Sequence, residues 1–164
     1  MGNDRSQILL RALLGGVLAG TGLSLSGLWW MLPALALLWS VAFNPLAAAL
    51  WGGLAVAISH RWLLALHPLT WLGVPELLSL PLAAAVWLGC VLAAALLLSG
   101  WSGLVRLLPG RGGALQALVL SLIWGLGETL LSRGPLFWIG VGGSVFPADP
   151  ALGGWWRWRG GGVP

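Results

Sequence analysis

The sequence is poor in charged residues, and it contains no lysine and no tyrosine. Only 7% of its 164 residues are charged, whereas soluble domains carry about a quarter. A surface that faces water cannot be built from so few charges. We therefore predict that the surface faces lipid and that the protein is embedded in a membrane.

Residue types that carry most enzyme chemistry are scarce. There is one cysteine, Cys90, so no internal disulfide can form. The two histidines are His60 and His67, but Pro68 follows the second one and no third metal ligand lies nearby. No serine has the surroundings of a nucleophile elbow, and no glycine-rich stretch has the pattern of a phosphate loop. The sequence therefore predicts no catalytic residue, no metal site and no cofactor.

Acidic residues are also few, and the net charge is +4. The eight arginines are scattered between apolar runs, and they form neither a basic stripe nor a recognition helix. Arginines at the ends of apolar segments are typical markers of membrane topology. We therefore predict no nucleic-acid partner and use the arginines to orient the chain.

Hydrophobic residues make up 59% of the chain, and there are 13 tryptophans. A membrane-spanning helix needs about 20 mostly apolar residues. Five segments approach this length: 7–25, 28–43, 46–66, 77–101 and 114–131. The sequence predicts an all-α membrane protein, a bundle of about five transmembrane helices without a soluble domain. Residues 1–134 would form this region, and 135–164 would form an extracytoplasmic tail rich in glycine and tryptophan.

The first apolar segment follows Arg5, as in a signal peptide, but it contains Arg11 and lacks a clear cleavage site. We therefore predict an uncleaved first helix. Its glycines would allow close approach of neighbouring helices; they are Gly15, Gly16, Gly20 and Gly22.

Arginines near the helix ends favour a cytoplasmic N-terminus. With five spans, four arginines fall on the side of the N-terminus and two on the other side. The first group is Arg5, Arg11, Arg106 and Arg111, and the second is Arg61 and Arg133. Arg157 and Arg159 in the tail count against this orientation. It places the loop 67–76 and the segment 134–138 on the outer face.

Two glutamates lie in or beside the predicted spans. Glu76 begins the fourth span, where the helix dipole favours a carboxylate. Glu128 lies inside the fifth span, where an ionisable group costs about 3 kcal/mol. Such a residue either faces the bundle interior and serves function or architecture, or lies near the outer end and pairs with Arg133. Both alternatives remain open from the sequence.

Two loops resemble those of a known family. Residues 66–75 (LHPLTWLGVP) resemble the segment after the third helix of apolipoprotein N-acyltransferases, particularly the cyanobacterial ones. Residues 124–138 (WGLGETLLSRGPLFW) look like that family's Glu-bearing helix and the Gly-Pro-aromatic segment after it. Gly143-Ser144 and Pro147 to Pro150 look like the continuation. The resemblance covers residues 9–154 approximately.

The resemblance implies an enzyme of lipoprotein maturation. The family moves an acyl group from a phospholipid to the N-terminal amine of a lipidated cysteine, through a thioester. It uses a Glu-Lys-Cys triad in a periplasmic nitrilase-like domain. This sequence has no lysine, and Cys90 lies inside a predicted span, so the resemblance carries over no catalytic residue.

We therefore expect the N-terminal membrane portion of such an enzyme, catalytically incomplete and truncated, in the bacterial inner membrane. Its partners would be membrane lipids, with a phospholipid acyl donor and a lipoprotein acceptor in the assembled enzyme. Trp71, Glu128, Arg133 and Trp138 would face the substrate or the catalytic domain. One alternative is a small transporter subunit or interaction module, favoured by Glu128. Another is a non-functional remnant.

Overall fold

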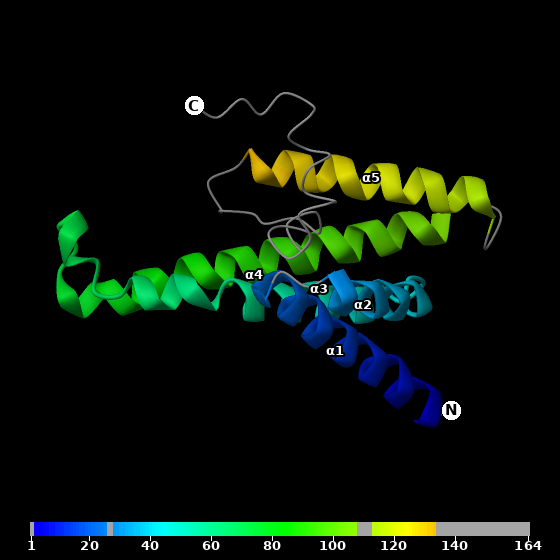
Figure 1. Cartoon of the computed structure of the whole chain (residues 1–164), viewed down its shortest axis with the longest axis horizontal. Coiled ribbons are helices and arrows are strands. Elements are labelled where there is room, and N and C mark those ends of the chain that lie inside the picture. The colour runs from blue at the N-terminus through cyan, green and yellow to red at the C-terminus, as the bar shows by residue number, and fades with distance from the viewer. Residues whose placement is uncertain (1, 26–27, 108–112, 134–164) are drawn as a thin grey trace.

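The computed structural model describes residues 2–25, 28–107 and 113–133, and all regular structure in these ranges is helical. Figure 1 shows the five α-helices of this part of the chain. They are α1 (Gly2–Leu25), α2 (Leu28–Ser40), α3 (Pro45–Ser59), α4 (Glu76–Leu107) and α5 (Ala114–Ser132). Two short 3₁₀-helices, η1 (Arg61–Leu66) and η2 (Leu69–Leu72), connect α3 to α4. The predicted all-α bundle is confirmed.

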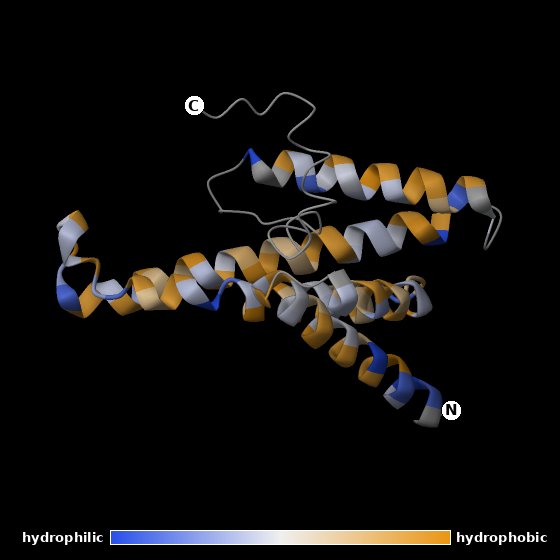
Figure 2. Ribbon diagram, in the orientation of Figure 1, coloured by the Kyte–Doolittle hydropathy of each residue, from blue (hydrophilic) through white to orange (hydrophobic). Residues whose placement is uncertain are grey.

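Three helical segments are long and apolar enough to cross a membrane, judged by length and composition. They are Asp4–Leu25, Pro45–Leu66 and Glu76–Leu107. The apolar stretches of α2 and α5 are shorter, Trp29–Ser40 and Leu115–Leu130. Figure 2 shows apolar residues distributed around the helices instead of on one face. That distribution is typical of helices surrounded by lipid and by other helices.

Some helix ends differ from those predicted. The second helix ends at Ser40 instead of residue 43 because a new helix begins almost at once. Asn44 caps α3 by accepting a hydrogen bond from the Ala47 amide at 3.1 Å, and Pro45 occupies its first turn. The third predicted segment, 46–66, is divided at His60 into α3 and η1. α4 continues to Leu107, beyond the predicted end at 101.

Glycines bring α1 against α3. A Cβ atom added to Gly16 would lie 2.8 Å from the carbonyl oxygen of Trp51. One added to Gly20 would lie 2.9 Å from the carbonyl oxygen of Ala55. Both neighbours are backbone atoms, which cannot move aside as a flexible side chain can. The two helix backbones therefore approach as closely as the sequence predicted.

α3 lies between α1 and α4 (Figure 1). Gly52 of α3 faces α4, where an added Cβ atom would lie 2.8 Å from Leu98 Cγ. The main core is formed mostly by small residues, with a few large ones between them. Its buried residues include Ala12, Ala19, Met31, Ala34, Leu38, Ala47, Ala48, Trp51, Ala55, Leu98 and Trp101.

The N-terminal part of α4 extends beyond the other helices, at the left of Figure 1. α4 has 32 residues, or about 48 Å at about 1.5 Å per residue. That exceeds the hydrocarbon core of a bilayer, which is about 30 Å thick. η1 and η2 pack on this projecting part. The buried Ser79 hydroxyl holds them there: it accepts a hydrogen bond from the Leu69 amide at 2.6 Å and pairs with His67 Nδ1 at 2.8 Å.

Candidate functional site

Four tryptophans from four helices contact one another between the helices. Trp101 of α4 lies edge-on to Trp39 of α2, with ring centroids 5.4 Å apart, and to Trp124 of α5 at 5.5 Å. Trp124 in turn lies edge-on to Trp51 of α3 at 6.2 Å. Edge-to-face geometry is favourable because the positive ring edge faces the negative ring face.

Two of these indoles also tie helices together through hydrogen bonds. Trp51 Nε1 donates to the Ala34 carbonyl of α2 at 3.1 Å. Trp101 Nε1 donates to the Leu120 carbonyl of α5 at 3.1 Å. A buried indole N–H requires such a partner, since an unpaired polar group in an apolar interior is costly. The tryptophans are therefore fixed in position as well as in contact.

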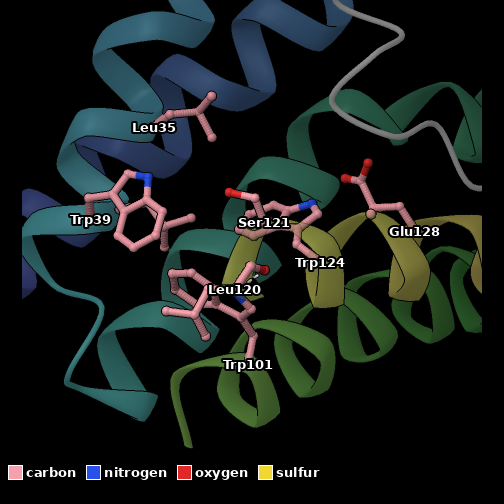
Figure 3. A pocket seen from close by; sticks show the side chains of 9 residues that line it. Leu35, Trp39, Trp101, Leu120, Ser121, Trp124 and Glu128 are labelled. Carbon is pink, nitrogen blue, oxygen red and sulfur yellow. Dashed lines mark hydrogen bonds between the residues drawn. The ribbon is translucent and has the colours of Figure 1, made fainter. Parts of the chain in front are cut away.

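A cavity of about 230 Å³ lies beside the tryptophans, between α2, α4 and α5. It is lined by Leu35, Leu38, Trp39, Trp101, Leu120, Ser121, Trp124, Gly125 and Glu128. In Figure 3, Leu35 and Trp39 face Ser121 and Trp124 across it, and Glu128 lies beyond Trp124 on α5. The walls are mostly apolar, with Ser121 and Glu128 as the polar side chains. Such a space suits an alkyl chain that carries a polar group near one end.

Glu128 faces the interior of the bundle. Its side chain is half-buried, and it also lines a smaller cavity of about 20 Å³. That cavity is formed by residues of α1, α2, α3 and α4, among them Leu23, Met31, Ala55 and Leu98. Arg133 is exposed and follows the last residue of α5. Glu128 therefore lines two cavities within the bundle, and its role there stays a prediction.

Trp71 lies in another part of the molecule. It is 69% exposed in η2, next to the start of α4. The C-terminal half of α5 packs much further along α4, where Gly127 faces Leu97. At about 1.5 Å per residue, about 27 Å of helix separates Ser79 from Leu97. The structure therefore does not bring Trp71 to Glu128, and Trp138 lies outside the described residues.

The remaining candidates for chemistry are occupied by packing and local hydrogen bonds. His60 Nδ1 pairs with the Ser59 hydroxyl at 2.9 Å. Cys90 is buried in α4 beside Val56, Leu63 and Ala94. Within residues 2–25, 28–107 and 113–133, no three His, Cys, Asp or Glu side chains lie close enough to hold a metal ion.

The sequence pattern did not single out Trp39, Trp101, Ser121 or Trp124. The sequence contains thirteen tryptophans. In membrane proteins this residue type is usually found at the membrane–water interface. Only the tertiary packing shows which of them contact one another. Of the residues that line this cavity, the sequence indicated a role only for Glu128.

The relatives found by comparison with known proteins all carry the same description. The apolipoprotein N-acyltransferase of Prochlorococcus marinus (strain MIT 9313) is 55% identical over 170 residues. That of Parasynechococcus marenigrum (strain WH8102) is 58% identical over 165 residues. Each match covers 99% of this chain. This chain is a relative of the cyanobacterial apolipoprotein N-acyltransferases.

The match covers only part of these enzymes. The chain spans 34% of the Prochlorococcus protein and 36% of the Parasynechococcus protein, and the matched part is their N-terminal third. A more distant apolipoprotein N-acyltransferase, from Thermosynechococcus vestitus, is 33% identical over 142 residues. No family model and no solved structure matches the chain. The resemblance seen in the two loops is therefore confirmed, and the apolar helices mark a membrane protein.

Proposed function

We propose that this chain is the membrane-embedded portion of an apolipoprotein N-acyltransferase. The observation that supports it most is 55% and 58% identity over 99% of the chain to two enzymes of that name. The all-α bundle with three long apolar helices is consistent with a membrane role. The activity of the relatives would then require the other two thirds of their length.

In this proposal the chain transfers no acyl group without a catalytic domain. It has no lysine, so it cannot supply the Glu-Lys-Cys triad that the resemblance implies. Cys90, its single cysteine, is buried within α4. The phospholipid acyl donor and the lipoprotein acceptor would bind where this region meets the catalytic domain.

The proposed location is the bacterial inner membrane, with the N-terminus in the cytoplasm. The N-terminus of α1 and the C-terminus of α4 share one end of the bundle (Figure 1), which carries Arg5, Arg11 and Arg106. Arg61 and Arg133 belong to the opposite end. An excess of arginine on one side favours the cytoplasm for that side.

On this orientation the projecting part with Trp71 and the end of α5 with Arg133 lie on the outer side. We assign Trp71, Arg133 and Trp138 to the surface that meets the catalytic domain. Glu128 and its cavity would lie on the lipid side of that surface, where an acyl chain enters. The cavity's apolar walls and single carboxylate support this assignment.

A chimera tests the proposal. The chain would be fused to the C-terminal two thirds of the Parasynechococcus enzyme and supplied with a diacylated lipopeptide and phospholipid vesicles. Mass spectrometry would follow addition of a third acyl chain. We expect acylation by the chimera and none by the chain alone. A membrane-inserted, folded chimera without activity would contradict the proposal, and so would acylation by the chain alone.

A second candidate function is proton-coupled transport, favoured by the position of Glu128 between two cavities. The purified chain in liposomes would then move protons down a gradient, and Glu128→Gln would abolish the flux. If the chain shows no proton flux and the chimera is active, transport is ruled out and only the acyltransferase role remains.

A further inference from the structure

A second hollow lies along the surface of α4 and α5. Its part between the two helices has a volume of about 400 Å³, and a neighbouring part at the end of α4 has about 550 Å³. The two parts share Gly100 and Leu104, and together we call them the α4/α5 groove. Its other residues include Leu96, Trp101, Gly103, Arg106, Leu107, Leu126, Gly127 and Leu130.

Two glycines keep this groove open. A Cβ atom added to Gly100 or to Gly103 would meet nothing within 4 Å. Gly127 on the facing helix is different, since its added Cβ atom would lie 2.7 Å from Leu97 Cδ1. Packing of the described helices therefore explains why position 127 is a glycine. It does not explain the glycines at positions 100 and 103. Their effect on the structure is to leave space that a larger side chain would occupy.

The dimensions of the groove match one acyl chain of one membrane leaflet. At about 1.5 Å per residue, about 16 Å of helix separates Leu96 from Leu107. One leaflet contributes about 15 Å of the hydrocarbon core. The leucines along the groove are widely exposed, with Leu96 at 73% and Leu107 at 79%. The walls are thus apolar, and these two leucines are exposed at the surface of the bundle.

One end of the groove carries a positive charge. Arg106 lines it, lies in the last turn of α4 and is exposed. The structure shows no ion pair or hydrogen bond between Arg106 and another side chain in residues 2–25, 28–107 and 113–133. A guanidinium binds phosphate oxygens through two parallel hydrogen bonds. This end therefore suits an anionic headgroup.

We propose that the α4/α5 groove binds an anionic phospholipid. One acyl chain lies along Gly100 and Gly103, and the phosphate contacts Arg106. The site is at the end of the bundle that holds the N-terminus of α1, away from η2 and the projecting part of α4 (Figure 1). The bound lipid is a resident of the fold and is not consumed, and its binding does not depend on the proposed acyltransferase role.

The test measures lipids retained by the purified full chain. The protein would be incubated with equal amounts of phosphatidylglycerol and phosphatidylcholine in detergent, and native mass spectrometry would count the bound lipids. The groove variant is Gly100→Leu with Gly103→Leu, and the charge variant is Arg106→Gln. Their controls are Gly89→Leu, at an equally open glycine three helical turns before Gly100, and Arg61→Gln.

We expect phosphatidylglycerol to be retained about fivefold over phosphatidylcholine, from one basic contact. Arg106→Gln should bring that ratio to about one, and the double glycine variant should lose both lipids. Both controls should behave like the unaltered chain. Equal retention of the two lipids by the unaltered chain would overturn the proposal. Unchanged lipid retention by the double glycine variant would also overturn it. So would the finding that the unaltered chain is a lipid-free dimer and that the double variant is a monomer, because the groove would then bind a second copy of the chain.

Discussion

The contact of α3 with α1 and α4 differs in construction from the contact of α4 with α5. The first is rich in glycine and alanine, and backbone atoms of α3 lie less than 3 Å from where a Cβ atom on Gly16 or Gly20 would be. The second is made of tryptophans, with a cavity of about 230 Å³ on one part and a groove on another. Close backbone approach leaves no room for a ligand, whereas large rings meeting edge to face leave space between them.

The two kinds of contact have different roles in the bundle: the glycine contacts form a scaffold, and the α5 side carries the candidate site. The close contacts at Gly16, Gly20 and Gly52 can hold α1, α3 and α4 in a single arrangement, since a Cβ atom at any of these three positions would collide. The α5 side carries the intramembrane carboxylate, the cavity and the groove. Substitutions on the first side should therefore act on stability, and those on the second side on binding and activity.

The largest effect is expected at Gly16. Gly16→Leu puts a side chain against the Trp51 carbonyl, and overpacking of this kind costs about 3 kcal/mol. Gly125→Leu is the matched control on α5, since an added Cβ atom there meets nothing within 4 Å. Unfolding in detergent followed by tryptophan fluorescence would measure both. Equal destabilisation by the two variants would remove the proposed difference between the contacts.

The projecting part of α4 should depend on one hydroxyl. Ser79→Ala removes the partner of the Leu69 amide and of His67, which should cost about 2 kcal/mol locally. Hydrogen exchange of residues 67–73 should accelerate, while exchange in α1 and α3 stays the same. Thr70→Ala, at an exposed neighbour, should leave exchange unchanged. Faster exchange throughout the bundle would show that this part is not independent of the scaffold.

A smaller effect is expected at the tryptophans. Trp101→Phe removes the hydrogen bond to the Leu120 carbonyl and should cost about 1 kcal/mol. Trp39→Phe keeps an aromatic ring against Trp101 and breaks no hydrogen bond that the structure shows within the described residues, so its cost should be smaller. Denaturation midpoints would compare the two. A larger loss from Trp39→Phe would mean that ring packing outweighs the hydrogen bond.

The smallest effect on stability is expected at Gly125. Gly125→Leu fills part of the 230 Å³ cavity without a collision, so stability should change by less than about 0.5 kcal/mol. Acyl transfer by the chimera described above should nevertheless fall, because less space remains for an alkyl chain. Unchanged activity would show that the cavity lies off the route of the substrate.

The sequence predicted the helices better than their contacts. Long apolar segments and the glycines of α1 were sufficient for the all-α bundle and for close helix packing. The division at His60 was not predicted, because apolar residues continue on both sides of the polar residues Ser59, His60 and Arg61. The loop resemblance indicated the family, which the relatives confirmed.

The candidate site was predicted only in part. An ionisable group in an apolar segment stands out, so Glu128 was recognised. Trp101 and Trp124 look like any other tryptophans in the sequence, and their meeting depends on how α4 and α5 pack. Trp71 was grouped with Glu128 because both were expected near the outer face, but the length of α4 separates them.

The most direct test of the difference between the glycine contacts and the α5 side uses two variants of the chimera, Glu128→Gln and Gly16→Leu. Their acylation rates and denaturation midpoints would be compared. The amide keeps the shape of the carboxylate and removes its charge. We predict that Glu128→Gln lowers the rate at least tenfold, about 1.4 kcal/mol in transition-state stabilisation, with an unchanged midpoint. Gly16→Leu should lower the midpoint strongly. A Glu128→Gln chimera with full activity and lowered stability would show that Glu128 serves the scaffold and not the site.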